Sequence, residues 1–86
     1  MMWRDGVVTG TRTAWGPAGR SCAELDVEIV GAPSGADGLL PGQRIRAVAY
    51  EALTGLPGAA ERVRLEVSAL DRALGTGGHA MVSSRL

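Results

Sequence analysis

The sequence contains no lysine, no asparagine and no phenylalanine, and it has a single cysteine, Cys22. A lone cysteine excludes an intramolecular disulfide, and a metal site would need further ligands that do not accompany it. We therefore expect a reduced thiol in the cytoplasm, and no metal or cofactor. Without phenylalanine, the core is expected to combine small aliphatic side chains with the few aromatic ones, which are Trp3, Trp15 and Tyr50.

Long apolar runs and a net charge are also missing. No stretch approaches the roughly 18 uninterrupted apolar residues that a membrane helix needs, and Met1–Asp5 lacks the apolar run of a signal peptide. Nine basic residues, all arginine, balance nine acidic ones. Because the formal net charge is zero, no long-range field attracts nucleic acid or a membrane surface. We expect a cytoplasmic protein without a membrane partner, and the missing residue types suggest a GC-rich bacterial genome.

Alternation of polar and apolar residues is the strongest pattern that is present. Within Ser21–Ile29, the odd positions from Ala23 onward are apolar, and three even positions carry carboxylates. Arg62–Ser68 repeats the pattern, and Gln43–Tyr50 does so more weakly. A period of two predicts β-strands with one buried and one solvated face. If Ser21–Ile29 and Gln43–Tyr50 belong to one sheet, the solvated face of that sheet carries charges of both signs.

Two further strands complete the expected sheet. Gly6–Trp15 is rich in β-branched residues, and Gly10 in its middle predicts a bulge or bend. Gly16–Arg20 then reads as a hairpin loop that makes the first two strands antiparallel neighbours. The short apolar run His79–Ser83 is expected to form the closing strand.

The connections include two short helical turns and one long loop. Glu51–Leu56 can form one helical turn that Gly55 ends, and Ser68–Leu74 predicts another near the C-terminus. Residues 31–42 lack periodicity and predict an exposed loop. Pairing across this loop would set Asp26 and Glu28 against Arg46 and Arg44 on the wet face. In the same register Val27 would meet Ile45 on the dry face.

An all-β fold follows, mainly antiparallel, in a single domain spanning residues 1–86, since 86 residues leave room for one core only. A small five-stranded barrel of the SH3-like or OB-like kind is expected, because closing the sheet hides its edges. The alternative is an open antiparallel sheet that dimerises.

Three segments resemble one bacterial protein family. These are Trp3–Val8, Ala49–Gly55 with its Leu-Thr-Gly, and Ala73–Gly78 with its Leu-Gly-Thr-Gly-Gly. In combination they are similar to the N-terminal region of a largely actinobacterial family, domain of unknown function 3866. The resemblance implies that the chain is the leading domain of a longer protein, and it supplies no reaction. The sequence departs from the family at Ala59–Glu61, Glu66–Ser68 and His79–Met81.

A glycine-rich turn and the single histidine are the first candidates for a site. Gly75, Thr76, Gly77 and Gly78, followed by His79, could form a backbone nest for an anion, or simply a turn. No lysine follows, so the run is not a phosphate-binding P-loop. His79 would need a partner such as Cys22, Asp71, Ser83 or Ser84 to act as a general base, and a structural or surface role is the alternative. We expect no catalytic residue.

Aromatic and arginine side chains are the other candidates. Trp15 and Tyr50 could stack on bases, or else serve as core or dimer contacts. An arginine face could bind phosphates, unless the acidic residues of the same sheet neutralise it. Its members would be Arg44, Arg46, Arg62 and Arg64, with Arg12 beside them if the strands adjoin.

Two hypotheses of function remain. The first is a non-catalytic interaction or assembly module with a protein partner or a second copy, using an apolar strand edge or an exposed tryptophan. The alternative is a nucleic-acid-binding module of the SH3-like or OB-like type that uses the arginine face and the two aromatic side chains.

Overall fold

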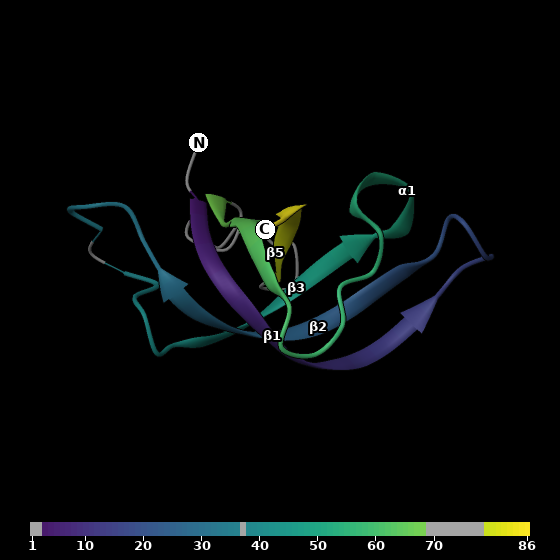
Figure 1. Ribbon diagram of the computed structural model, residues 1–86, viewed down its shortest axis with the longest axis horizontal. Coiled ribbons are helices and arrows are strands. Elements are labelled where there is room, and N and C mark those ends of the chain that lie inside the picture. Colours follow the sequence, from purple (N-terminus) through teal and green to yellow (C-terminus); the bar gives the residue numbers. More distant parts are fainter. Residues whose placement is uncertain (1–2, 37, 69–78) are drawn as a thin grey trace.

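Five strands and one turn of α-helix make up the computed structural model, which describes residues 3–36, 38–68 and 79–86 (Figure 1). The helical turn covers Glu51–Thr54, and the chain leaves it at Gly55 with a φ of 74°. The helical turn expected over Ser68–Leu74 falls, apart from Ser68, outside the described residues. The elements are β1 (Trp3–Trp15), β2 (Cys22–Gly31), β3 (Arg44–Tyr50), α1 (Glu51–Thr54), β4 (Arg62–Glu66) and β5 (His79–Arg85).

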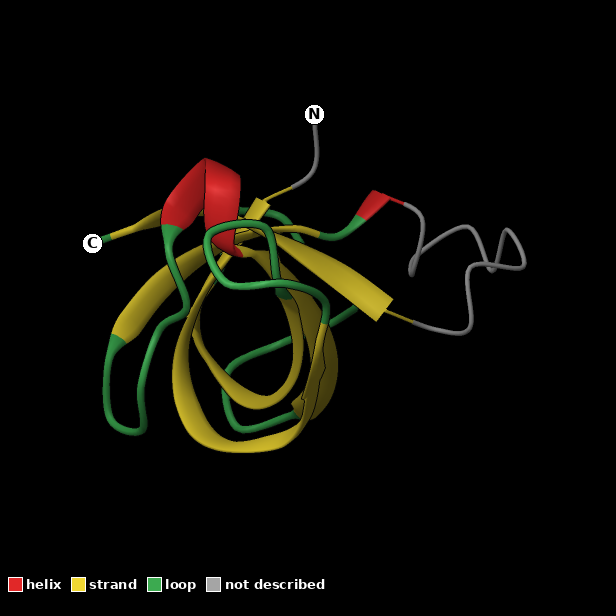
Figure 2. Cartoon of the chain, turned by 90° about the vertical axis from the view of Figure 1, so that its right-hand side faces the viewer, coloured by secondary structure: helices red, strands yellow, loops and turns green. Residues whose placement is uncertain are grey.

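The strands close into a barrel in the order β1-β2-β3-β5-β4, and the ring is visible end-on in Figure 2. Four of the five contacts between neighbouring strands are antiparallel. The fifth is a short parallel contact that pairs Arg46–Val48 of β3 with His79–Met81 of β5. The predicted all-β, five-stranded barrel is confirmed, and its form is compatible with the SH3-like and OB-like types.

The core lies inside the ring and consists of small aliphatic side chains. Each amphipathic strand turns its apolar positions inward, so that Leu25 of β2 and Leu65 of β4 are fully buried. The sequence analysis placed aromatic residues in this core, and that expectation is wrong. Trp15 and Tyr50 are 50% and 39% exposed, because both occupy outward positions across from Cys22. The core members are Val8, Ala23, Leu25, Val27, Ala47, Ala49, Val63, Leu65, Val67, Ala80 and Val82.

Pairing between β2 and β3 follows the predicted register. Asp26 lies opposite Arg46, and Glu28 lies opposite Arg44, on the outer face. Val27 meets Ile45 on the inner face, where a one-residue slip would expose every apolar side chain of the strand. The period of the apolar positions therefore disfavours a one-residue slip of this register.

β1 is long enough to serve two partners. It pairs with β4 over Trp3–Val7 and with β2 over Asp5–Trp15. The pairing with β2 shifts register between Val8 and Gly10, which confirms the irregularity predicted at this glycine. Beyond Val8, the described strands pair with β1 on the β2 side only. The expectation that closure would hide both edges is therefore wrong for this half of β1, which projects as a hairpin arm (Figure 1).

A buried arginine fixes the connection between β2 and β3 to the barrel. Arg4 of β1 is 2% exposed, and its guanidinium donates hydrogen bonds to the carbonyls of Gly38 and Leu39 at 2.9 and 2.8 Å. Leu39 packs against the core, while Ser34 and Gly35 of the same connection are exposed. The connection is thus anchored at one end and exposed at the other.

The hairpin loop between β1 and β2 is attached to α1 by one carboxylate. Oε1 of Glu51 accepts hydrogen bonds from the Gly19 amide at 2.9 Å and from the amide and hydroxyl of Ser21 at 3.2 and 2.6 Å. The Glu51 amide donates in turn to the Ser21 carbonyl. These donors lower the pKa of Glu51, and the Ser21 hydroxyl makes the largest contribution.

Candidate binding surface on strands β3 and β5

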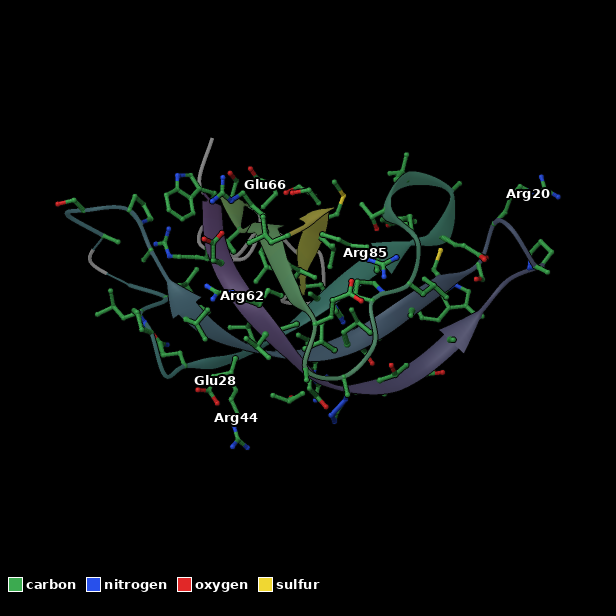
Figure 3. All side chains as sticks on the ribbon, viewed as in Figure 1. Arg20, Glu28, Arg44, Arg62, Glu66 and Arg85 are labelled. Carbon is green, nitrogen blue, oxygen red and sulfur yellow. The ribbon has the colours of Figure 1, made fainter. Side chains whose placement is uncertain are left out.

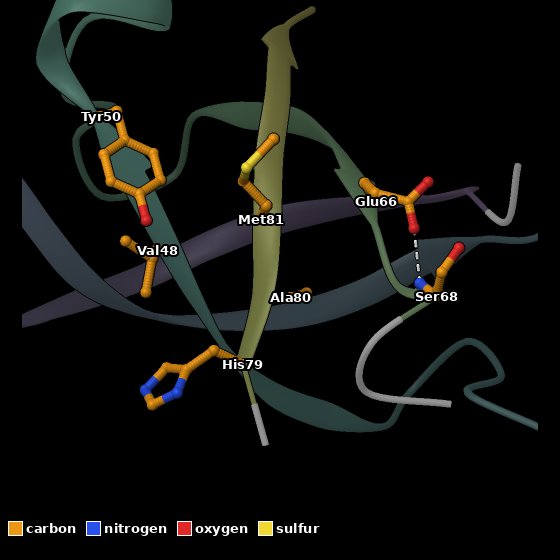
Figure 4. Close-up of a pocket in the computed structure, with 7 residues that line it drawn as sticks. All are labelled: Val48, Tyr50, Glu66, Ser68, His79, Ala80 and Met81. Atoms are coloured by element: carbon orange, nitrogen blue, oxygen red, sulfur yellow. Dashed lines mark hydrogen bonds between the residues drawn. The ribbon is translucent and has the colours of Figure 1, made fainter. Parts of the chain in front are cut away.

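A cavity of about 370 Å³ lies on the outer face of the barrel, over β3, β5 and the end of β4. Figure 4 shows Met81 between Tyr50 and Val48 on one side and Glu66 and Ser68 on the other. The volume is within the range of small-molecule and side-chain binding pockets. The residues that line it are Val48, Tyr50, Glu66, Ser68, His79, Ala80 and Met81.

Register between the strands explains why these side chains meet. Val48 of β3 lies opposite Met81 of β5, and Met81 lies opposite Glu66 of β4. All three occupy outward positions, because their neighbours along each strand belong to the core. The cavity floor is therefore a cross-strand row of outward side chains, two of them apolar.

An exposed apolar patch borders this cavity. We call it the β3–β5 patch, and it consists of Tyr50 and Met81, which are 39% and 40% exposed. Tyr50 and Met81 line the cavity as well. Exposed apolar side chains gathered around a concavity are typical of an interaction site.

His79 contacts a carboxylate that sequence reasoning did not consider. Its Nε2 is hydrogen-bonded to Oε2 of Glu24 in β2, and this contact is the largest cause of the lowered pKa of Glu24. Ser83, one of the partners that we considered, donates its hydroxyl to the Arg64 carbonyl instead. Asp71 lies outside the described residues.

The register of β2, β3 and β5 brings Glu24 within hydrogen-bond distance of His79. His79 lies opposite Arg46 in the parallel contact, and Arg46 lies opposite Asp26, two residues from Glu24 on the same face of β2. Such a contact depends on β3 and β5 being neighbours. The order of the strands around the barrel could not be read from the sequence.

The four candidate arginines do not form one basic face. Arg44 and Arg46 are on β3, whereas Arg62 and Arg64 are on β4, and β5 separates the two strands. Arg64 donates to the Asp5 carboxylate at 2.8 Å and lies over the Trp3 ring, 4.6 Å from its centroid.

Acidic residues also accompany the arginines of the β1–β3 side. Nε of Arg44 lies 4.0 Å from a carboxylate oxygen of Glu28, and Figure 3 shows both side chains on the same outer surface. Arg12 of β1 lies 3.6 Å from Asp26 and 3.9 Å from Glu24. The described surface therefore carries mixed charge where the hypothesis of phosphate binding required a positive stripe.

The remaining candidates are placed as follows. Trp15 lies on the same cross-strand row as Tyr50, with Cys22 between them. His79 and Tyr50 line the cavity together. The glycine-rich turn formed by Gly75, Thr76, Gly77 and Gly78 lies outside the described residues.

Sequence reasoning missed most of the cavity lining. Val48, Glu66, Ser68, Ala80 and Met81 received no attention as site residues, although a signal was present at two of them. Val48 and Met81 are apolar residues at outward positions of their strands. Apolar side chains at outward positions of neighbouring strands lie side by side and can form a contiguous apolar surface.

Residues 3–36, 38–68 and 79–86 contain neither a cluster of metal ligands nor a membrane-spanning helix. There, no group of three or more histidine, cysteine, aspartate or glutamate side chains is placed to hold a metal ion. Within the same residues, no helix has the length and apolar character required to cross a membrane.

The fold and this surface define a small closed β-barrel domain with a half-open cavity across β3, β5 and β4. Residues 46–86 match the family model described as "Protein of unknown function (DUF3866)", which supports the family resemblance seen in the sequence. The matched segment runs from β3 to the C-terminal residue and includes every described residue that lines the cavity. The chain matches no curated protein and no solved structure.

Proposed function

We propose that this domain is a non-catalytic interaction module that holds a protein partner at the β3–β5 patch, by itself or as the front domain of a longer protein. The observation that carries the proposal is the position of Met81. It is 40% exposed, it lies in the middle of the cavity lining, and it is apolar on the wet face of its strand. An exposed apolar side chain within a cavity lining offers a partner an apolar contact.

Two hydrogen bonds near the patch join strands of the barrel. Nε2 of His79 in β5 is hydrogen-bonded to the Glu24 carboxylate of β2, and the Ser83 hydroxyl of β5 donates to the Arg64 backbone carbonyl of β4. Contacts of this kind hold the strands that carry the patch in fixed positions, which supports its use as a binding surface.

A displayed library of random peptides tests this proposal. We expect the wild-type domain to select peptides with apolar anchors, since the patch and the cavity wall are mainly apolar. Selected peptides should lose binding to Met81→Glu, which places a charge in the cavity lining. They should keep binding to Leu40→Glu, the matched control, because Leu40 is 43% exposed in the connection between β2 and β3.

Two results would contradict the proposal. One is a selection that enriches no peptide, and the other is a set of peptides that bind wild type and Met81→Glu equally well. Circular dichroism of both variants excludes loss of the fold as the reason for lost binding.

Binding of single-stranded nucleic acid is the second candidate, and one observation favours it. Trp15 and Tyr50 are exposed on one cross-strand row, and the parallel β3–β5 contact with a helical turn after β3 suits an OB-like barrel. Such barrels stack bases on outer-face aromatic residues. The proximity of Arg44 to Glu28 and of Arg64 to Asp5 weakens this candidate. Fluorescence anisotropy with labelled oligonucleotides at low and high salt tests it, and salt-insensitive or flat titrations remove it.

A further inference from the structure

The cavity over β3, β5 and β4 is amphipathic across the strands. Val48 of β3 lies opposite Met81 of β5, and Met81 lies opposite Glu66 of β4, so the row runs from two apolar side chains to a carboxylate. Figure 4 shows Met81 between Val48 and Glu66. Because neighbouring strands are about 4.8 Å apart, the row spans roughly 10 Å from β3 to β4. An occupant that lies along this row needs an apolar body that ends in a polar group.

Glu66 determines which polar group fits. The residue is half-buried, and its Oε1 accepts a hydrogen bond from the Ser68 amide at 2.5 Å. A carboxylate has two oxygens with about four acceptor sites, so it has the capacity for further donors from an occupant. Partial burial makes an interaction with such a donor stronger than it would be in water.

The charges around the cavity favour a cation. Among the described lining residues, Glu66 is the acidic one and none is an arginine. His79 is hydrogen-bonded to the Glu24 carboxylate, which balances its charge when the imidazole is protonated. Arg64, two residues before Glu66 on the same face of β4, donates to Asp5 at 2.8 Å. A wholly apolar occupant would remove water from the Glu66 carboxylate without replacing it, which is costly, and a phosphate would meet a like charge.

We propose that the cavity holds an arginine side chain of a partner protein, with its aliphatic stem on Val48 and Met81 and its guanidinium on the Glu66 carboxylate. The proposal rests on the interaction role argued above and names the group that the partner supplies. The stem of an arginine covers apolar surface while its head stays polar, and the planar head can donate two parallel hydrogen bonds to one carboxylate. A lysine fits less well, because its ammonium is more strongly hydrated and cannot form this pair of bonds.

An arginine in the cavity is compatible with apolar anchors beside it. Tyr50 and Met81 are both partly exposed, so they offer apolar contacts to neighbouring residues of the same partner. Met81→Glu stays disruptive for such a partner, because the aliphatic stem would then cover a second carboxylate.

Peptides that the wild-type domain selects from a displayed random library test the proposal. We expect an arginine to recur in them beside the apolar anchors. A synthetic peptide of this sequence should bind Glu66→Gln about 10-fold more weakly than wild type, because a hydrogen bond between charged groups is lost. The glutamine keeps an oxygen for the Ser68 amide, so the circular dichroism spectrum should not change. Glu28→Gln is the matched control, since it removes the same charge beside Arg44, and it should bind like wild type.

A change in the peptide gives a second measurement that leaves the domain intact. Citrulline in place of the arginine keeps the shape of the side chain but removes its charge. We expect wild type to bind the citrulline peptide about 10-fold more weakly than the arginine peptide. Glu66→Gln should bind the two peptides alike, because the pair is then already broken.

Three results overturn the arginine as occupant. The first is a set of selected peptides that depend on Met81 but contain no arginine, and the second is equal binding of the arginine and citrulline peptides by wild type. The third is displacement of the labelled peptide by added unlabelled domain that carries Met81→Glu, which would make a second copy of this chain the occupant. As long as peptide binding depends on Met81, the interaction role stands in each case. If no selected peptide depends on Met81, both proposals fail.

Discussion

At the scale of single residues, Arg4 is important for the fold although no pattern in the sequence pointed to it. It is the one charged side chain that is buried among the described residues. Its guanidinium donates to three carbonyls, those of Trp3, Gly38 and Leu39, at 2.7, 2.9 and 2.8 Å. The side chain therefore supplies hydrogen-bond donors to the carbonyls of Gly38 and Leu39, which lie in the connection between β2 and β3, outside the strands.

Replacement of this side chain should destabilise the fold. Arg4→Met keeps an unbranched aliphatic stem but removes every donor, so that the Gly38 and Leu39 carbonyls lose their partner. We expect the free energy of unfolding to fall by about 2–3 kcal/mol, the usual effect of leaving buried polar groups unsatisfied. Urea denaturation measures the change.

Arg20→Met is the matched control for that measurement. Arg20 is exposed in the hairpin loop (Figure 3), where we expect a change within about 0.5 kcal/mol. If the two variants are equally stable, the proposed role of the Arg4 hydrogen bonds is wrong.

Sequence reasoning overlooked Arg4 for a specific reason. The first strand was expected to begin at Gly6, whereas β1 begins at Trp3. Extended by three residues, the same alternation puts Arg4, Gly6 and Val8 on the inward face. An arginine at an inward position predicts a buried hydrogen-bonding role, but its partners in the connection between β2 and β3 carry no pattern that identifies them.

At the scale of elements, β1 contains two glycines that do different work. Gly6 is buried where β1 pairs with both β2 and β4, and a Cβ there would overlap Cγ1 of Val27 and lie 3.2 Å from the Glu28 carbonyl. Gly10 has nothing within 4 Å of the same position. Neither residue has a positive φ, so space alone distinguishes them.

This difference predicts opposite outcomes for one substitution. Gly6→Ala should lower the free energy of unfolding by about 1–3 kcal/mol, because the core must move to accept a methyl group. Gly10→Ala should change it little. Thermal denaturation followed by circular dichroism compares the two, and similar midpoints for both variants would show that β1 does not pack on β2 as closely as described.

Individual strands could be predicted from the sequence, whereas the order of the strands around the barrel could not. The alternation in Ser21–Ile29 and Gln43–Tyr50 predicted the inward faces and the opposition of Asp26 to Arg46. No local pattern indicates that β3 and β5 are parallel neighbours, since that contact joins segments more than 30 residues apart in the sequence. The cavity lies at this contact, and it was missed for the same reason.

At the scale of the whole molecule, carboxylates that join different strands and loops make stability depend on pH. Hydrogen bonds from His79, Ser21 and Arg85 are the largest causes of the lowered pKa values of Glu24, Glu51 and Glu61. A carboxyl whose pKa is lower in the folded state stabilises the fold above its ordinary pKa. That contribution is lost as the pH falls through the folded-state pKa.

We therefore expect the midpoint of urea denaturation to be constant above the ordinary glutamate pKa of 4.5 and to decrease steadily below it. Glu51→Gln should reduce this dependence, because the amide no longer titrates while the hairpin loop keeps an acceptor. Glu28→Gln is the control, since Glu28 contacts Arg44 only at 4.0 Å, and it should retain the dependence of wild type. An unchanged slope in Glu51→Gln would remove Glu51 from this account.

The parallel seam between β3 and β5 has a consequence for how the molecule opens. It is paired over three residues on each strand, whereas the contacts of β1 with β2 and of β2 with β3 run much longer. A closed barrel is expected to open locally at the strand pair with the fewest backbone hydrogen bonds. Amide protons of Arg46–Val48 that face β5 should therefore exchange with solvent before those that face β2. The barrel then opens by separation of β3 from β5, and this opening would disrupt the cavity, which lies over both strands.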